Sequence, residues 1–129
     1  YLLDTNTCVY AIKREARMVE RLQSHSPDDF GISAVTLAEL WFGAAKSSRP
    51  KPTRQSVDAF LRPFEILPFG SEAAGAYAET RLSLEKKGEP IGERDLLIAA
   101  TAISLKLTVV THNLREFSKV PRLQVEDWR

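Results

Sequence analysis

The sequence predicts an α/β protein with a mostly parallel sheet of four to five strands and helices on both faces. Short apolar runs alternate with longer stretches of helical spacing, and parallel strands need such crossovers between them. With 129 residues, 43% hydrophobic and 27% charged, the chain is expected to form one domain, residues 1–129, with its own core. No apolar run approaches the ~20 residues of a membrane span, so no membrane association is predicted.

The first half of the chain is expected to run from strand to helix twice. A strand at 1–3 stops at Asp4, and helices follow at 7–13 and 16–23. After a break at 26–29, a strand at 30–34 leads into a helix at 35–46. Apolar residues, Trp41 and Phe42 among them, cover nearly every face of that helix, which predicts burial on most sides.

The second half continues the alternation. Residues 47–53 form an exposed basic loop or hairpin tip, a helix resumes at 55–61, and a third strand covers 65–69. Helices are predicted at 71–87 and 95–103, with a turn-rich connection at 88–92 between them. A β-branched strand at 106–111 and a short edge strand at 123–125 complete the sheet.

Four polar side chains are expected at one edge of this sheet. Asp4 and Asn113 follow two strands, and Glu39 and Asp95 lie in the first turns of two apolar helices, so parallel strands would gather them where ligands bind. Each carboxylate also has an ordinary explanation. Asp4 can cap a helix or turn, Glu39 can close a capping box begun by Thr36, and Asp95 can favour a helix N-terminus.

Carboxylates gathered in one pocket repel each other, and a divalent cation relieves that repulsion. Ligands that are all oxygen favour Mg²⁺ or Mn²⁺ over Zn²⁺. Basic residues cluster at 13–21, 46–54, 86–87 and 115–122, either as solvated surfaces or as sites for a polyanion. Carboxylates with Mg²⁺ beside basic patches suit the hydrolysis of a phosphodiester.

Other chemistries have little support in the sequence. His25 and His112 lack the spacing of zinc ligands, and no glycine-rich phosphate loop or nucleophile elbow is present. The single cysteine, Cys8, lies among apolar residues and is expected to be buried, in keeping with a cytoplasmic location. Tyr1 begins inside a predicted strand, so we expect a residue or two upstream, and nothing there resembles a signal peptide.

Four stretches along the whole chain share a recognisable pattern. They are Leu3-Asp4-Thr5-Asn6; Ile32-Ser33 with Thr36-Leu37-Ala38-Glu39-Leu40 and Gly43; Pro90-Ile91-Gly92 with Asp95 and Ile98-Ala99-Ala100; and Val110-Thr111-His112-Asn113 with Arg115-Glu116-Phe117, running on to Val125-Glu126-Asp127-Trp128. In this order they resemble the PIN-domain proteins, specifically the VapC-type toxin ribonucleases of bacterial toxin–antitoxin pairs.

The resemblance implies a single PIN-like domain with Mg²⁺-dependent endoribonuclease activity. The enzyme would cleave tRNA or another structured RNA, and this cleavage would inhibit translation and growth. Its catalytic acids would be Asp4, Glu39 and Asp95, with Asn113 at a position that is Asp or Asn in the family and Glu116 as a further acid. Asn6 and Thr111 would hold the ligands by hydrogen bonds. The implied partners are a second copy of the chain and a VapB-type antitoxin, in a groove that Trp41 and Phe42 could line.

Our mechanistic hypothesis is that Asp4 and Asp95 bind Mg²⁺ and that Glu39 orients or deprotonates the attacking water, with Arg94 and Arg115 on the RNA backbone. Three alternatives remain at this point. A phosphotransferase of the haloacid-dehalogenase type would use Asp4 as its nucleophile, although this chain has Asn6 where that family needs a second Asp. The others are a metal-binding module without turnover and a nuclease that cleaves DNA.

Overall fold

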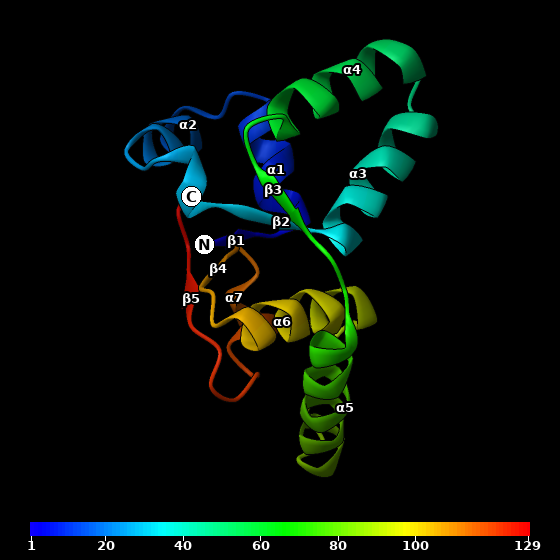
Figure 1. Cartoon of the computed structure of the whole chain (residues 1–129), viewed down its shortest axis with the longest axis vertical. Coiled ribbons are helices and arrows are strands. Elements are labelled where there is room, and N and C mark those ends of the chain that lie inside the picture. Colours follow the sequence, from blue (N-terminus) through cyan, green and yellow to red (C-terminus); the bar gives the residue numbers. More distant parts are fainter.

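The computed structural model describes all 129 residues and contains one parallel sheet of five strands in the order β3-β2-β1-β4-β5 (Figure 1). The strands are β1 (Leu2–Leu3), β2 (Gly31–Ser33), β3 (Glu65–Leu67), β4 (Val109–Val110) and β5 (Val125–Glu126). Every pairing is parallel, because a helical crossover separates successive strands along most of the chain. The predicted α/β fold is confirmed.

Seven α-helices cover the sheet from both sides, four on one face and three on the other (Figure 1). The first group is α1 (Thr5–Ile12), α2 (Ala16–Gln23), α3 (Ala34–Ala45) and α4 (Pro50–Leu61), with a 3₁₀ turn, η1 (Pro27–Asp29), between α2 and β2. The second group is α5 (Ser71–Lys86), α6 (Glu93–Leu105) and α7 (Leu114–Phe117). None of these helices combines the length and apolar character needed to cross a membrane.

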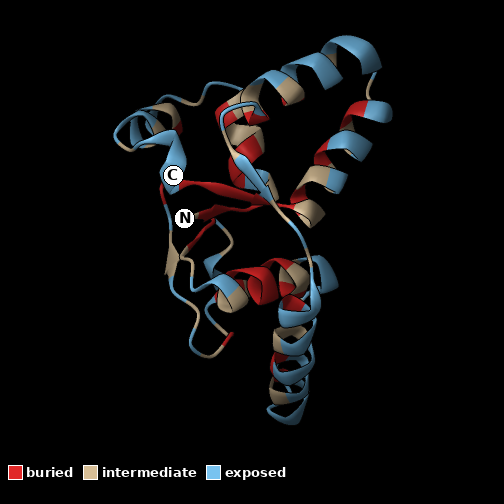
Figure 2. Ribbon diagram, in the orientation of Figure 1, coloured by how far each residue is buried: buried red, intermediate tan, exposed pale blue.

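The two central strands separate two hydrophobic cores. Leu3 and Val110 belong to the core beneath α1, α2 and α4, whereas Leu2 and Val109 belong to the core beneath α5, α6 and α7. All four side chains are fully buried. Figure 2 shows β1 and β4 in the buried centre of the molecule and α5 largely exposed outside it. Because successive strand residues point to opposite faces, this alternation fixes the register of β1 against β4.

The order of the strands creates a switch point between β1 and β4. From β1 the chain adds β2 and then β3 on one side, and it later returns to add β4 and β5 on the other. Crevices for ligands form at the carboxyl ends of strands where the order reverses in this way. Asp4 and Asn113, which follow β1 and β4, are therefore placed at the predicted edge.

Helix boundaries differ from the sequence prediction at two prolines and at one aspartate. Helix α4 begins at Pro50 and contains Pro52, although residues 47–53 were expected to form a loop or hairpin tip and the helix to resume only at 55. The first turn of a helix tolerates proline, because its N–H groups have no partner within the helix. Helix α1 begins at Thr5, since Asp4 caps it directly.

The prediction that α3 is buried on most sides is wrong. Phe42 is 63% exposed and Trp41 37% exposed. Trp41 packs against α4, where its Nε1 donates a hydrogen bond to Asp58 Oδ1 at 2.9 Å and the Arg54 guanidinium lies 3.8 Å from the ring centroid. An apolar sequence on every face does not require that every face is covered, and α3 has one side open to solvent.

Helix α6 extends two residues beyond its predicted end, which shortens the strand that follows. Lys106, expected to begin a strand at 106–111, ends the helix with a left-handed backbone at φ 56°. Its N–H and that of Leu107 bond back to the carbonyls of Ile103 and Ala102, so the chain turns sharply before β4. Only Val109 and Val110 retain strand pairing to β1.

We predict that Lys106→Gly stabilises the protein. A side chain with a Cβ in this backbone region is strained, and glycine removes that strain at the expense of a more flexible unfolded chain, for a net gain of about 0.5–1 kcal/mol. Thermal unfolding followed by circular dichroism should show a higher Tm. Lys106→Ala keeps the Cβ and is the control, so a Tm for the glycine variant no higher than that of the alanine variant contradicts the prediction.

Candidate active site

Asp4 is buried at the carboxyl edge of the sheet, and both of its carboxylate oxygens accept hydrogen bonds. Its Oδ1 accepts a hydrogen bond from the Thr7 N–H at 2.9 Å, which caps α1, and its Oδ2 accepts one from the Thr111 hydroxyl after β4. Only 4% of Asp4 is exposed. The residue is thus a helix cap and also part of the predicted constellation, and Thr111 takes the supporting position expected for it.

Asp95 and Asn113 meet across the same edge. Asp95 is the third residue of α6, in the first turn as predicted, and Asn113 follows β4 as the cap residue of the short helix α7. The side-chain amide of Asn113 donates to Asp95 Oδ2 at 3.2 Å, while its backbone N–H donates to Thr111 Oγ1 at 2.9 Å. The Thr111 hydroxyl therefore joins Asp4 to the backbone of Asn113.

Glu39 reaches the site from a position that the sequence did not predict. Ser33 caps α3 by accepting from the Thr36 N–H, so the alternative of a capping box between Thr36 and Glu39 is not realised. Glu39 lies in the middle of the helix, and the prediction that it lies in the first turn is wrong. Its Oε1 accepts a 2.7 Å hydrogen bond from the Thr5 hydroxyl, and its Oε2 a 3.1 Å bond from Arg94 Nη1.

These groups line one pocket of about 560 Å³ at the switch point. It brings together four of the five predicted catalytic residues, and its full lining is Asp4, Thr5, Asn6, Glu39, Gly92, Glu93, Arg94, Asp95, Leu97, Ile98 and Asn113. The sequence analysis missed Thr5 and Glu93. Each lies within two residues of a predicted ligand, which was the only signal available.

Glu116, the fifth predicted catalytic residue, is on α7 outside this lining and forms an ion pair with Lys119 at 3.7 Å. Arg115, expected beside the RNA, is exposed and also lies outside the pocket. Asn6 lines the pocket but makes no side-chain hydrogen bond to the acids. The support expected from Asn6 is therefore absent from this arrangement, whereas that from Thr111 is present.

The acids of the site affect one another electrostatically. Burial, the largest cause, and the charges of Asp4, Glu116 and Glu39 together raise the pKa of Asp95 from 3.8 to about 6. The hydrogen bond from Asn113 opposes that shift. Such a shift identifies a carboxyl group whose charge the surrounding protein does not fully compensate, which is common at functional sites.

The donor set fits a hard cation, although the side chains are not closed around one point. Carboxylate and amide oxygens are the ligands that Mg²⁺ prefers, and Asp4 and Asp95 face the same pocket. No group of three or more acidic, histidine or cysteine side chains is gathered tightly enough to hold an ion as it stands. Glu39 is instead paired with Arg94.

The cysteine and the two histidines, which were considered as a nucleophile and as metal ligands, lie outside the acidic pocket. Burial raises the pKa of the Cys8 thiol, so Cys8 is an inert core residue, as expected. The His25 ring stacks on Trp128 with the ring centroids 5.2 Å apart, and His112 Nδ1 lies 3.0 Å from Asp127 Oδ2. Neither histidine lines the acidic pocket.

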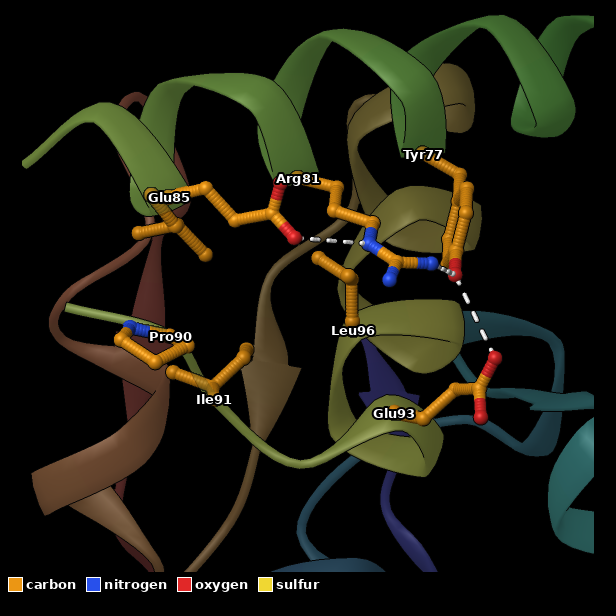
Figure 3. A pocket seen from close by; sticks show the side chains of 8 residues that line it. Tyr77, Arg81, Glu85, Pro90, Ile91, Glu93 and Leu96 are labelled. Carbon is orange, nitrogen blue, oxygen red and sulfur yellow. Dashed lines mark hydrogen bonds and ion pairs between the residues drawn. The ribbon is translucent and has the colours of Figure 1, made fainter. Parts of the chain in front are cut away.

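A second, smaller cavity of about 140 Å³ lies between α5 and α6 (Figure 3). Its polar side chains pair with one another: Arg81 donates to Glu85 Oε1 at 3.3 Å and to Tyr77 Oη at 2.9 Å, and the Tyr77 hydroxyl donates to Glu93 Oε1 at 3.4 Å. Glu93 lines both cavities. The polar groups of the smaller cavity are thus engaged with one another, whereas four of the predicted catalytic residues line the larger, acidic pocket.

Known proteins resemble the chain over nearly its whole length. The PIN domain family matches residues 1–123. Ribonuclease VapC2 of Rickettsia felis is 40% identical over 132 residues and the tRNA(fMet)-specific endonuclease VapC of Salmonella typhimurium 38% identical over 128, each match covering 99% of this chain and 97% of the relative. The crystal structure of DNA-bound VapBC from Salmonella typhimurium matches with a TM-score of 0.95 and 40% identity, over 99% of this chain and 97% of that chain. The chain therefore belongs to the PIN domain family and, within it, to the VapC ribonucleases.

Proposed function

We propose that this protein is a Mg²⁺-dependent endoribonuclease, the toxin of a toxin–antitoxin pair, which cleaves tRNA or another structured RNA and so inhibits translation and growth. The observation that carries the proposal is the pocket at the β1–β4 switch point, which Asp4, Glu39 and Asp95 line together. The family supports it, because the relatives of this chain are named ribonucleases and a tRNA endonuclease.

Asp4 and Asp95 would hold the cation, with Mn²⁺ as an alternative to Mg²⁺. When bound, Mg²⁺ supplies Lewis acidity, which promotes deprotonation of water and stabilises negative charge on the phosphate. Thr7 and Thr111 already orient the carboxylate of Asp4, so little reorganisation is needed there. Asn113 orients Asp95 in the same way through its amide.

Glu39 would act as the base of the reaction. Its carboxylate lies between α1 and α6, where the Thr5 hydroxyl fixes Oε1 and leaves Oε2 directed at Arg94. We assign to Oε2 the proton of the attacking water. Glu116 would contribute through its charge, which acts on Asp95.

The proposed partners are RNA as substrate, a VapB-type antitoxin and a second copy of the chain, in the cytoplasm. A solved relative is a VapBC complex bound to DNA, which supports the antitoxin partner. The open side of α3, with Trp41 and Phe42, offers exposed apolar area for it. No observation favours the phosphotransferase alternative, because Asn6 is an amide where that chemistry needs an acid.

We predict that Asp4→Asn and Asp95→Asn each lower RNA cleavage by at least about 100-fold. Asparagine at position 4 still accepts the Thr7 N–H bond and caps α1, so the fold should survive. Cleavage of unfractionated tRNA with Mg²⁺, followed on gels and stopped by EDTA, measures the effect. Glu79→Gln, an exposed acid on α5, is the control that should stay active.

A variant of Asp4 or Asp95 that cleaves at the wild-type rate contradicts this assignment. Single-stranded DNA of matching sequence, tested in parallel, separates the two nuclease alternatives: cleavage of DNA with RNA left intact favours a DNA nuclease. Mg²⁺ binding without cleavage of either polymer favours a module without turnover.

Thr111→Val should raise the Mg²⁺ concentration needed for half-maximal cleavage by about 10- to 100-fold. Valine has nearly the shape of threonine but lacks the hydroxyl that bonds Asp4 and the backbone of Asn113. Thr111→Ser keeps that hydroxyl and should restore the wild-type Mg²⁺ midpoint. A shift of similar size in both variants means that the hydroxyl does not act in this way.

Asp95→Asn should raise the Tm in EDTA at about pH 7.5, because a pKa raised to about 6 means that the folded state disfavours the charged carboxylate. Between the ordinary value of 3.8 and about 6, the folded state holds the proton more tightly than the unfolded state, so the wild type loses stability as pH rises through this window. The advantage of the variant should therefore shrink as pH falls toward about 4. A Tm difference that is the same at every pH contradicts this origin.

A further inference from the structure

Arg94 is the only cationic side chain that lines the acidic pocket. Four carboxylates share that lining with it: Asp4, Glu39, Glu93 and Asp95. A phosphate of RNA that enters the pocket would meet repulsion from all four. Apart from a bound cation, Arg94 is the one group in the lining that can offset this repulsion.

In the free protein Arg94 is occupied. Its Nη1 lies 3.1 Å from Glu39 Oε2, a contact that bridges α6 and α3 across 55 residues of sequence. The other oxygen of Glu39 accepts the Thr5 hydroxyl bond at 2.7 Å. Both oxygens of Glu39 are thus engaged, and the oxygen assigned to accept the proton from water is the one that Arg94 covers.

The ion pair between Arg94 and Glu39 has the features of a contact in which another anion can replace Glu39. The Arg94 side chain is 76% exposed and that of Glu39 21% exposed. An ion pair with so much access to water contributes little net stability. Arg94 uses one of its N–H groups in this contact, and a phosphate can take two of the guanidinium N–H groups at once in stronger, charge-assisted bonds.

We propose that Arg94 is a substrate-exchanged residue: Glu39 holds it in the free protein, and a phosphate of the bound RNA takes it over, which uncovers Glu39 for the reaction. The inference rests on the proposed nuclease function and deepens it. RNA binding then completes the catalytic arrangement, and the pocket without RNA keeps its base covered.

This exchange predicts two effects of opposite sign when Arg94 is removed. Without the guanidinium, Glu39 is free and the pocket is more negative, so a divalent cation binds more tightly in the absence of RNA. RNA loses a phosphate contact and binds more weakly. A purely structural role for Arg94 predicts instead that both affinities fall, because the pocket would be disordered.

The experiment compares the wild type, Arg94→Ala and Arg94→Lys, with Arg81→Ala as a matched control. Arg81 is 53% exposed and pairs with Glu85 on α5 outside the acidic pocket (Figure 3). Calorimetric titration with Mn²⁺ alone measures cation affinity. Fluorescence anisotropy with a short labelled single-stranded oligoribonucleotide in Ca²⁺ measures RNA affinity over a salt series, and gels of the same samples confirm that the RNA is intact.

For Arg94→Ala we expect the Kd for Mn²⁺ to fall by about threefold or more and the Kd for RNA to rise about tenfold. The slope of log affinity against log salt should weaken by roughly 0.7, the value for one contact to a single strand. Arg94→Lys keeps the charge but not the paired donors and should lie between wild type and alanine. Arg81→Ala should match the wild type in both titrations.

Three results overturn the inference, and they are distinguishable. If the wild type cleaves RNA while Arg94→Ala binds it as tightly, the exchange is wrong and the nuclease function stands. If both affinities fall in Arg94→Ala, the residue is structural. If the wild type neither binds the oligoribonucleotide nor cleaves unfractionated tRNA in Mg²⁺, the proposed function and the exchange fail together.

Discussion

The two hydrogen bonds that the carboxylate of Asp4 accepts hold the site together. One comes from the Thr7 N–H at the start of α1 and the other from the Thr111 hydroxyl beyond β4, so a single side chain joins the ends of two neighbouring strands. The register of those strands is fixed by side chains that alternate between two cores. A slip by one residue would turn both leucines of β1 to the wrong face and remove Asp4 from the edge. The geometry of the pocket is therefore a consequence of core packing.

The parts of the site that the sequence predicts are those that local backbone structure determines. Asp4 and Asn113 follow strands, and Asp95 lies in the first turn of a helix, so their positions follow from the alternation of elements. Glu39 was misplaced because Ser33 and Thr36 are both good helix caps, and in the structure it is Ser33 that caps α3. Its bonds to Thr5 and Arg94 join residues 34 and 55 positions apart, and no local pattern encodes contacts of that kind.

The amide at position 113 limits the electrostatic repulsion between the carboxylates of the pocket. Burial and three neighbouring acids already raise the pKa of Asp95, and a fourth carboxylate beside it would add to that repulsion. Asn113 instead offers an N–H donor to Asp95 and adds no charge. Asp4, Glu39 and Asp95 are held by three different elements, α1, α3 and α6, so repulsion cannot separate these three carboxylates without moving the elements themselves.

The place of β4 beside β1 also sets when the site can exist during synthesis of the chain. Asp4 and Thr111 are 107 residues apart, and β1 leaves the ribosome long before its neighbour β4 is made. An interrupted chain that ends before β4 contains Asp4, Glu39 and Asp95 but lacks Asn113 and the Thr111 hydroxyl that bonds Asp4. Contacts between distant residues form late, after the intervening chain has been ordered. Incomplete chains therefore carry the acids without the contacts beyond β4 that hold Asp4 and Asp95 in place.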